Sequence, residues 1–286
     1  MDVYEIKITK GQLQSLPEAE RILVLQFGHV CNELSFLNKL LLMVSDTKTK
    51  GLEKKAMAIQ AMIVARLYIG KVFEAWRMIQ RDYFVSHLSK TLDTELNEEG
   101  KKSLKVLKSY FGKNNLLSCI RNDFSFHYWA EHLPKAMDAF DDSREFQLIL
   151  GGAYANTLHN FSEEFVTVAM LQASGESEAQ AAMDRVIGEL VSIGGKMITF
   201  SDMVLPLCSR TALESLGKTS NIRFTRFNRK KALKHLRCRS SSSWGNGVSP
   251  NTYAQADSLR RRFAPCSSLV SFALAWQRNK NELGIL

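Results

Sequence analysis

Residues 23–44 read LVLQFGHVCNELSFLNKLLLMV, a run with the clearest helical periodicity in the chain. Its apolar residues recur in alternating steps of four and three, at Leu23, Phe27, Val30, Leu34, Leu37, Leu41 and Val44. That spacing places all of them in one stripe along an α-helix. Ser15 and Pro17 precede the stripe and are typical of residues at a helix start. The stretch therefore predicts a long amphipathic helix that begins near Pro17.

A second apolar stripe follows the polar segment 46–51. It uses the same steps, at Ala58, Met62, Ala65, Ile69, Val72, Trp76, Ile79 and Tyr83. The stripe predicts a helix over about residues 52–92. Two long helices joined by a short loop pack antiparallel as an αα-hairpin. We therefore expect a helical hairpin at the base of the fold.

The rest of the first 219 residues also has mainly helical periodicity. Apolar spacing and end signals predict further helices over 97–111, 154–172, 177–196 and 201–216, the last of them bent near Pro206. The one strand-like run is Phe146–Leu150, which two glycines follow. The expected fold class is all-α, an up-and-down helical bundle built on the hairpin.

Composition favours a cytoplasmic protein that does not span a membrane. Hydrophobic residues make up 45% of the 286 residues, enough for a sizeable core. The N-terminus lacks a secretory signal pattern, and no stretch reaches the roughly 18 apolar residues of a membrane span. The five cysteines form no CxxC pair, which argues against a zinc knuckle and fits a reducing compartment.

Charge divides the chain at about residue 220. Residues 220–286 hold 13 Lys and Arg against two acids, a net charge of +11, whereas residues 1–219 hold 25 against 27, a net charge of −2. We therefore expect a helical domain over 1–219 and a basic, partly disordered tail over 220–286. Such asymmetry is typical of a tail that binds nucleic acid or an anionic surface.

The first part of the tail favours RNA as the partner. Its basic residues alternate with Phe224 and Phe227, a pattern that suits phosphate contact and base stacking. The candidate RNA-binding residues are Arg223, Arg226, Arg229, Lys230 and Lys231. The competing interpretation is a basic tail without a defined role. We assign no function to residues 240–286, because their composition is also typical of a gene end that is translated out of frame.

The segment Arg121–His127, followed by Tyr128, carries the candidate chemistry. We expect Asn122 or Asp123 to cap a helix, which would place His127 one turn further along the same side. Arginine offers a fixed, charged fork for a phosphate, and the proton of a histidine can move near neutral pH. A free helix N-terminus would add affinity for an anion. A phosphodiester is one substrate that uses all three.

An arginine, a polar Asn122 and a histidine after five intervening residues, within a helical body, resemble the motif of the HEPN superfamily (higher eukaryotes and prokaryotes nucleotide-binding). The resemblance covers about residues 15–200. It implies a metal-independent endoribonuclease, with Arg121 and His127 catalytic and Asn122 orienting the pair. Asp123 and Tyr128 would support them. It also implies a homodimer with a composite cleft, and a toxin or phage-defence effector with an antitoxin or sensor protein as a further partner.

Cleavage by attack of the ribose 2′-hydroxyl needs no metal ion and no cofactor, and the sequence contains no obvious cluster of metal ligands. Two alternatives stay open: a helical module that binds RNA or nucleotide without cutting it, and a protein-interaction module. In a purely structural interpretation, Arg121 would pair with a surface acid and His127 would lie in a packed helix. Glu74 is either one half of a surface pair with Arg77 or an acid that supports the site. His29 and Glu33 either hold Arg121 or His127 in place or form a polar strip beside the apolar stripe, and we favour the strip.

Overall fold

The computed structural model describes residues 8–45, 50–125, 130–152 and 157–209. Nearly all of these residues that belong to a regular element are helical, which confirms the all-α class. The described residues divide into two units, residues 8–21 with Ser209 and residues Ile22–Cys208. The predicted boundary at residue 219 and the predicted basic tail lie outside the described residues.

The described part of the first unit contains helix α1, Lys10–Gln14. Thr9 precedes it, and its hydroxyl accepts the backbone N–H of Gln12 at 3.2 Å. The side chain of Gln12 in turn accepts the backbone N–H of Thr9 at 2.8 Å. This reciprocal capping box satisfies two N–H groups that a helix start otherwise leaves without partners.

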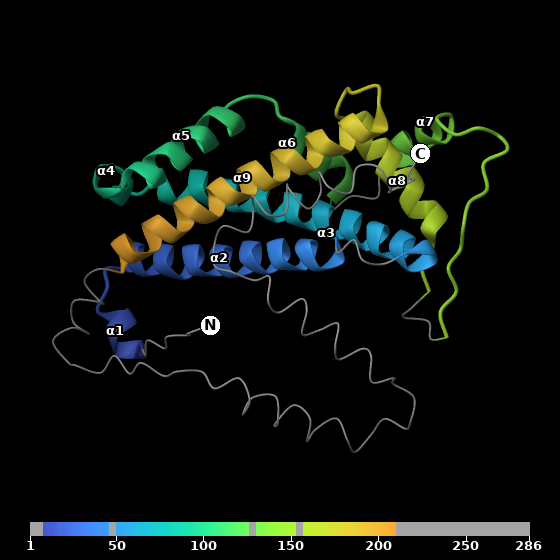
Figure 1. Ribbon diagram of the computed structural model, residues 1–286. Coiled ribbons are helices and arrows are strands. Elements are labelled where there is room, and N and C mark those ends of the chain that lie inside the picture. Colours follow the sequence, from blue (N-terminus) through green and yellow to red (C-terminus); the bar gives the residue numbers. More distant parts are fainter. Residues whose placement is uncertain (1–7, 46–49, 126–129, 153–156, 210–286) are drawn as a thin grey trace, which may run out of the picture. The chain divides into compact units, whose positions relative to one another are not determined.

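The two predicted striped helices form as α2, Glu18–Val44, and α3, Gly51–Met78. Gln26 in α2 donates to Asp82, just beyond α3, and Lys71 in α3 donates to Glu33 of α2 at 2.7 Å. Since the partner number falls as the number along α2 rises, the two helices run in opposite directions (Figure 1).

The predicted single helix over 52–92 is wrong beyond Met78. The backbone changes to a π-helical turn, η1, at Ile79–Tyr83, and a separate helix α4 follows at Leu88–Glu95. Ser89 lies at the start of α4, and its hydroxyl bonds the carbonyl of Ser86 at 3.0 Å. Polar side chains that bond nearby carbonyls compete with a continuous helix.

The helix predicted over 97–111 is confirmed as α5, Glu98–Phe111. The side chain of Asn97 caps it by accepting the backbone N–H of Gly100 at 2.8 Å. This cap joins residues that are only three positions apart, so it forms independently of how distant parts of the chain pack. The remaining described elements are α6 (Leu116–Ile120), η2 (Arg121–Ser125), η3 (Ala130–His132), α7 (Leu133–Met137), α8 (Asn160–Gln172) and α9 (Ala179–Cys208).

Two predictions in the second half of the chain are corrected. The run Phe146–Leu150 forms no strand; Ile149 makes one isolated antiparallel bridge with Leu158, so α8 begins only at Asn160. The predicted helices over 177–196 and 201–216 are joined, within the described residues, as the single helix α9. The predicted gap at residues 197–200 is helical, and the apolar face of α9 packs there and along its length against α3 and α5 (Figure 1).

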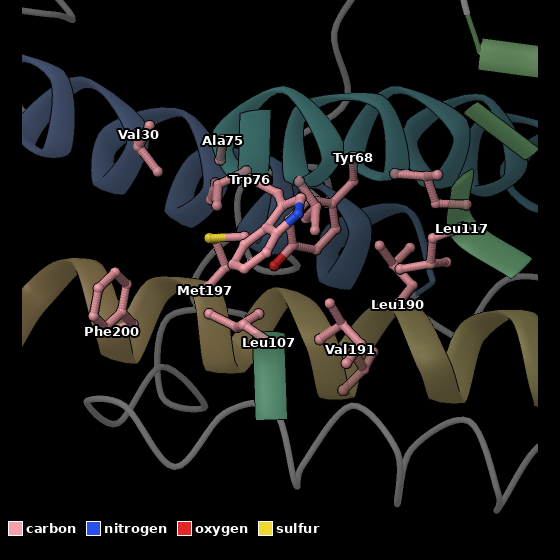
Figure 2. Packing of buried hydrophobic residues seen from close by; sticks show 14 of the residues in the cluster. Val30, Tyr68, Ala75, Trp76, Leu107, Leu117, Leu190, Val191, Met197 and Phe200 are labelled. Atoms are coloured by element: carbon pink, nitrogen blue, oxygen red, sulfur yellow. The ribbon is translucent and has the colours of Figure 1, made fainter. Parts of the chain in front are cut away.

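The core of the second unit lies between α2, α3, α5 and α9. Figure 2 shows Trp76 and Tyr68 of α3 opposite Met197, Leu190 and Val191 of α9. Three fully buried rings meet edge to face, with centroids 5.5–5.9 Å apart: Phe27, Tyr83 and Phe200. Each such pair adds roughly 0.5–1.5 kcal/mol beyond the burial of its area.

Two segments of the described chain, Gly51–Tyr83 and Ala179–Cys208, are long and apolar enough to cross a membrane by length and composition. In the structure, 56% of the most apolar window of the first segment and 39% of that of the second are buried inside the protein. Core helices of proteins without a membrane span pass the same test, so this feature is weak support for a span.

Candidate functional site

The candidate site is built on η2, the π-helical turn Arg121–Ser125 that continues directly from α6. Asn115 caps α6, because its side-chain oxygen accepts the backbone N–H of Ser118 at 2.9 Å. The expectation that Asn122 or Asp123 caps a new helix is therefore wrong. The helix has already begun at Leu116, so no free helix N-terminus lies at Asp123 to attract an anion.

A π-helical turn places more residues in each turn than an α-helix and is frequently found at functional sites. In this chain it turns Arg121 toward α3. One terminal nitrogen of Arg121, Nη2, donates to Glu74 Oε1 at 2.6 Å, and Nη1 donates to Asn122 Oδ1 at 3.1 Å. The contact joins two segments that are 47 residues apart in the sequence.

The guanidinium of Arg121 is mostly enclosed. Its side chain is 19% exposed, whereas that of Glu74 is 43% exposed. The guanidinium carbon lies 5.0 Å from the ring centroid of Phe73, within the range of a cation–π contact. The Nε atom is buried and has no hydrogen-bond acceptor. The arginine is thus fixed by a carboxylate, an amide and a ring, which pre-sets its position.

Asp123 lies in the same turn and faces two other groups. His132 Nε2 is 3.6 Å from Asp123 Oδ2, and the Sγ of Cys119 is also 3.6 Å from that oxygen. Burial, followed by the nearby charge of Asp123, raises the pKa of the Cys119 thiol, so this cysteine is a poor nucleophile near neutral pH. The ring of Phe124 lies 5.2 Å from that of His132.

Several predicted site residues lie outside the part of the chain that the structure describes. His127 and Tyr128 lie outside the described residues, as do the tail residues Arg223, Arg226, Arg229, Lys230 and Lys231. Of the predicted set, the structure brings together Arg121 and Asn122, with Asp123 on the same turn.

Two residues outside the motif, Glu74 and His132, contact it in the structure. Glu74, whose side chain is 43% exposed, accepts a bond from Arg121 at 2.6 Å. This contact fits both the interpretation of Glu74 as an acid that supports the site and the alternative in which Arg121 pairs with a surface acid. His132 is not part of the predicted site, yet its Nε2 lies 3.6 Å from Asp123 Oδ2. The sequence places Glu74 close to Trp76 on the striped helix. No local pattern identifies Arg121 as the partner of Glu74.

The strip of His29 and Glu33 stays on the surface of α2. His29 Nε2 is 3.5 Å from Glu33 Oε2, and Glu33 also accepts a bond from Lys71 at 2.7 Å. Within the described residues, the hydrogen bonds and ion pairs of His29 and Glu33 join α2 to itself and to α3, not to Arg121. This favours the interpretation of a polar strip that ties α2 to α3.

Within the described ranges, no group of three or more His, Cys, Asp or Glu residues is arranged to hold a metal ion. Comparison with known proteins adds no family: no protein-family model matches the chain, and no curated protein or solved structure is significantly similar to it. The chemistry proposed for this site therefore rests on the motif that begins at Arg121 and on the contacts of Arg121.

Proposed function

We propose that the protein is a metal-independent endoribonuclease of HEPN type that cleaves single-stranded RNA. The observation that carries the proposal is the fixed Arg121 on the π-helical turn, with Asn122 bonded to it and His127 four residues beyond Asp123 in the sequence. An all-α fold with two long helices ahead of the motif, α2 and α3, is compatible with the family resemblance.

In the proposed reaction the ribose 2′-hydroxyl attacks the adjacent phosphorus atom, and the bond from phosphorus to the 5′-oxygen breaks. The imidazole of His127 takes the 2′-hydroxyl proton or gives a proton to the leaving oxygen. Arg121 donates to the phosphate oxygens, where negative charge increases in the transition state. The products are a 2′,3′-cyclic phosphate and a 5′-hydroxyl.

Glu74 has a positioning role in this scheme. A guanidinium carries five N–H donors, and the recorded bonds to Glu74 and Asn122 engage two of them. Donors on both terminal nitrogens therefore remain for a phosphate. Because Glu74 is itself partly exposed, an incoming phosphate also competes with its carboxylate for the same nitrogen.

The wider assignment follows from the same resemblance. We propose a cytoplasmic homodimer in which two motifs form one cleft, acting as a toxin or phage-defence effector that an antitoxin or sensor protein controls. The basic residues after Asn221 would add affinity for RNA through phosphate contacts.

The test is gel-resolved cleavage of single-stranded RNA in EDTA by the wild type and by Arg121→Ala, His127→Ala and Arg185→Gln. Arg185 is a matched control, because it also pairs with carboxylates but lies on α9. We expect Arg185→Gln to cut like the wild type and the two motif variants to lose cleavage. Intact RNA with the folded wild type would contradict the proposal.

A protein-interaction module is the second candidate, and one feature of α2 favours it. Four large apolar side chains on α2 are exposed by 44–63%, at Ile22, Leu25, Phe36 and Met43. Their spacing of three, eleven and seven residues aligns them on one face, opposite the buried stripe. Exposed apolar groups on one helix face are typical of protein contacts. Loss of partner binding on Phe36→Ser, with RNA left intact by the wild type, would favour this function.

A further inference from the structure

The segment Phe146–Leu150, which the sequence predicts as a strand, is paired within its own chain along one edge only. Ile149 exchanges both of its backbone hydrogen bonds with Leu158, at 2.9 and 2.8 Å. The carbonyl of Gln147 accepts the backbone N–H of Phe161 at 3.1 Å. The two odd-numbered residues of the segment therefore bond the stretch that leads into α8, as every second residue of an extended strand does.

The opposite edge of the segment belongs to its even-numbered residues, Phe146, Leu148 and Leu150. In an extended strand, the N–H and C=O groups of neighbouring residues point to opposite sides. Within the described residues, the backbone groups of these three have no hydrogen-bond partner. Figure 1 shows the segment as part of the long connection between α7 and α8. The chain therefore presents an unpaired strand edge, which is a template for a further strand.

The side chains along this free edge are apolar and exposed. Phe146, Leu148 and Leu150 are 37%, 48% and 75% exposed. Successive side chains of a strand point to opposite faces, and Gln147 marks the other face. Its amide accepts a bond from Lys55 of α3 at 3.2 Å, and it lines a cavity of about 400 Å³ between α3 and α8. The three apolar side chains thus share one face, beside backbone groups that lack partners.

One end of this apolar row is held by aromatic rings. The ring of Phe146 lies 5.1 Å from that of Phe140 and 4.8 Å from that of Phe165 in α8, measured between centroids. Such ring contacts fix the position of the Phe146 side chain. Leu148 and Leu150 continue the row beyond the rings and are more exposed. The row therefore has an ordered end on which a partner can pack and a far end that its own chain does not cover.

A second copy of the same segment fits this edge in one antiparallel register. When Leu148 lies opposite Leu148 of the second copy, Phe146 lies opposite Leu150, and each of the three exchanges N–H and C=O bonds with the residue opposite. Every pair that meets is apolar, and such cross-strand pairs stabilise a sheet. Glu145 falls opposite Gly151, so no like charges face each other. This register is its own two-fold image, so the contact closes as a dimer.

We propose that two copies of the chain pair their 146–150 segments antiparallel about Leu148, which completes the strand that the sequence predicts. Leu150 of each copy then packs against Phe146 of the other, next to the rings of Phe140 and Phe165. The pairing places backbone groups and apolar side chains that are now exposed between the two copies. No residue of the Arg121 turn takes part, so this contact does not depend on RNA cleavage.

The test is sedimentation velocity of the full chain over a range of concentrations. Leu148→Lys places two like charges opposite each other on the two-fold axis, so it should raise the dissociation constant of the dimer at least about tenfold. Leu25→Lys makes the same change at an exposed leucine on α2 and should dimerise like the wild type. Circular dichroism checks that both variants are folded. A monomeric wild type, a dimer that Leu148→Lys leaves intact, or one that Leu25→Lys dissociates would overturn the proposal.

The register is tested by disulfide crosslinking under oxidising conditions. Opposite residues of such a pair have Cα atoms about 5.5 Å apart, within the range of a disulfide. Leu148→Cys should therefore give a crosslinked dimer on a non-reducing gel. The cysteines of Leu150→Cys would lie about 14 Å apart and should give no more dimer than the wild type, whose five cysteines set the background. Equal crosslinking of the two variants would refute this register.

Discussion

Arg121 Nη2 and Glu74 Oε1 lie 2.6 Å apart, and this bond ties the π-helical turn η2 to the middle of α3. Both residues come from segments that carry the candidate chemistry, yet their sequence positions give no indication that they meet. The arginine is mostly enclosed, so loss of the acid would leave a charged group with fewer partners. Replacement of Glu74 therefore lowers the stability of the fold as well as affecting any reaction at this site.

The Arg121–Glu74 pair should be energetically coupled. In a double-mutant cycle of Arg121→Ala and Glu74→Ala, we expect a coupling free energy of about 1 kcal/mol, a low value because Glu74 is partly exposed. Urea unfolding of the four proteins measures it. The more exposed pair Lys101–Glu98 on α5 serves as the control and should give less than about 0.5 kcal/mol. Coupling no larger than in the control pair would contradict the contact.

The close approach of α9 to α3 at Gly194 should tolerate no side chain. A Cβ added there would lie 2.5 Å from the hydroxyl oxygen of Tyr68, a fully buried group. We expect Gly194→Ala to lower the free energy of unfolding by about 1–3 kcal/mol. On the same helix, a Cβ at Gly188 would meet nothing within 4 Å, so Gly188→Ala should raise stability by up to about 1 kcal/mol. Thermal unfolding of both variants distinguishes them, and equal effects would refute this packing.

The hydroxyl of Tyr68 should contribute nothing favourable to stability. It is buried without a hydrogen-bond partner, and burial raises the pKa of this phenol. An unsatisfied buried hydroxyl costs free energy, so Tyr68→Phe should leave stability unchanged or increase it by about 1 kcal/mol. Tyr83→Phe is the contrasting variant, because the Tyr83 hydroxyl donates to Asp93 at 2.6 Å. It should lower stability, and a loss of equal size for Tyr68→Phe would contradict the burial of an unpaired group.

Cys31 should resist alkylation in the native protein. Burial, with a smaller contribution from Asp202, raises the pKa of its thiol to about 12, against an ordinary value of 9.0. The thiolate fraction at neutral pH is then about a thousandfold lower, and the thiolate is the reactive form. Peptide mass spectrometry after iodoacetamide treatment should show Cys31 labelled only in denaturant. Rapid labelling of Cys31 in the folded chain would count against this environment.

Asp82 should make stability sensitive to acid. Hydrogen bonds from Arg81, and a smaller one from Gln26, hold the pKa of this carboxyl below its ordinary value of 3.8. Because the folded-state pKa is lowered, the stabilisation is present above about pH 4 and is lost as the pH falls below it. Asp82→Asn should therefore lower stability at pH 7 but have little effect near pH 2. Urea unfolding at the two pH values checks this, and an effect independent of pH would rule it out.

The sequence predicted those parts of the fold that depend on local or periodic signals. The stripe of α2 identified Leu23, Phe27 and Leu34, all nearly fully buried, and Asn97 caps α5 as its position suggests. The π-helical turn η1 could not be predicted, because its residues continue the apolar spacing of α3. Packing of the surrounding helices, which no local pattern encodes, decides where the backbone departs from an α-helix.

The candidate site was only partly predictable for the same reason. Arg121 and Asn122 stand out as neighbours in the sequence, and they do contact each other. The role of Glu74 depends on the rotation of α3 relative to η2, and the cavity between α3 and α8 depends on these helices lying side by side. These arrangements join residues that are far apart in the chain, so spacing alone does not reveal them.

The most direct test of the central claim compares cleavage of one RNA sequence with cleavage of its fully 2′-O-methylated form, both in EDTA. If the 2′-hydroxyl is the nucleophile, the wild type cuts only the unmodified RNA and leaves 2′,3′-cyclic phosphate ends, while Arg121→Ala and His127→Ala cut neither. Cleavage of the methylated RNA, or cleavage that persists in both variants, would contradict the proposed mechanism.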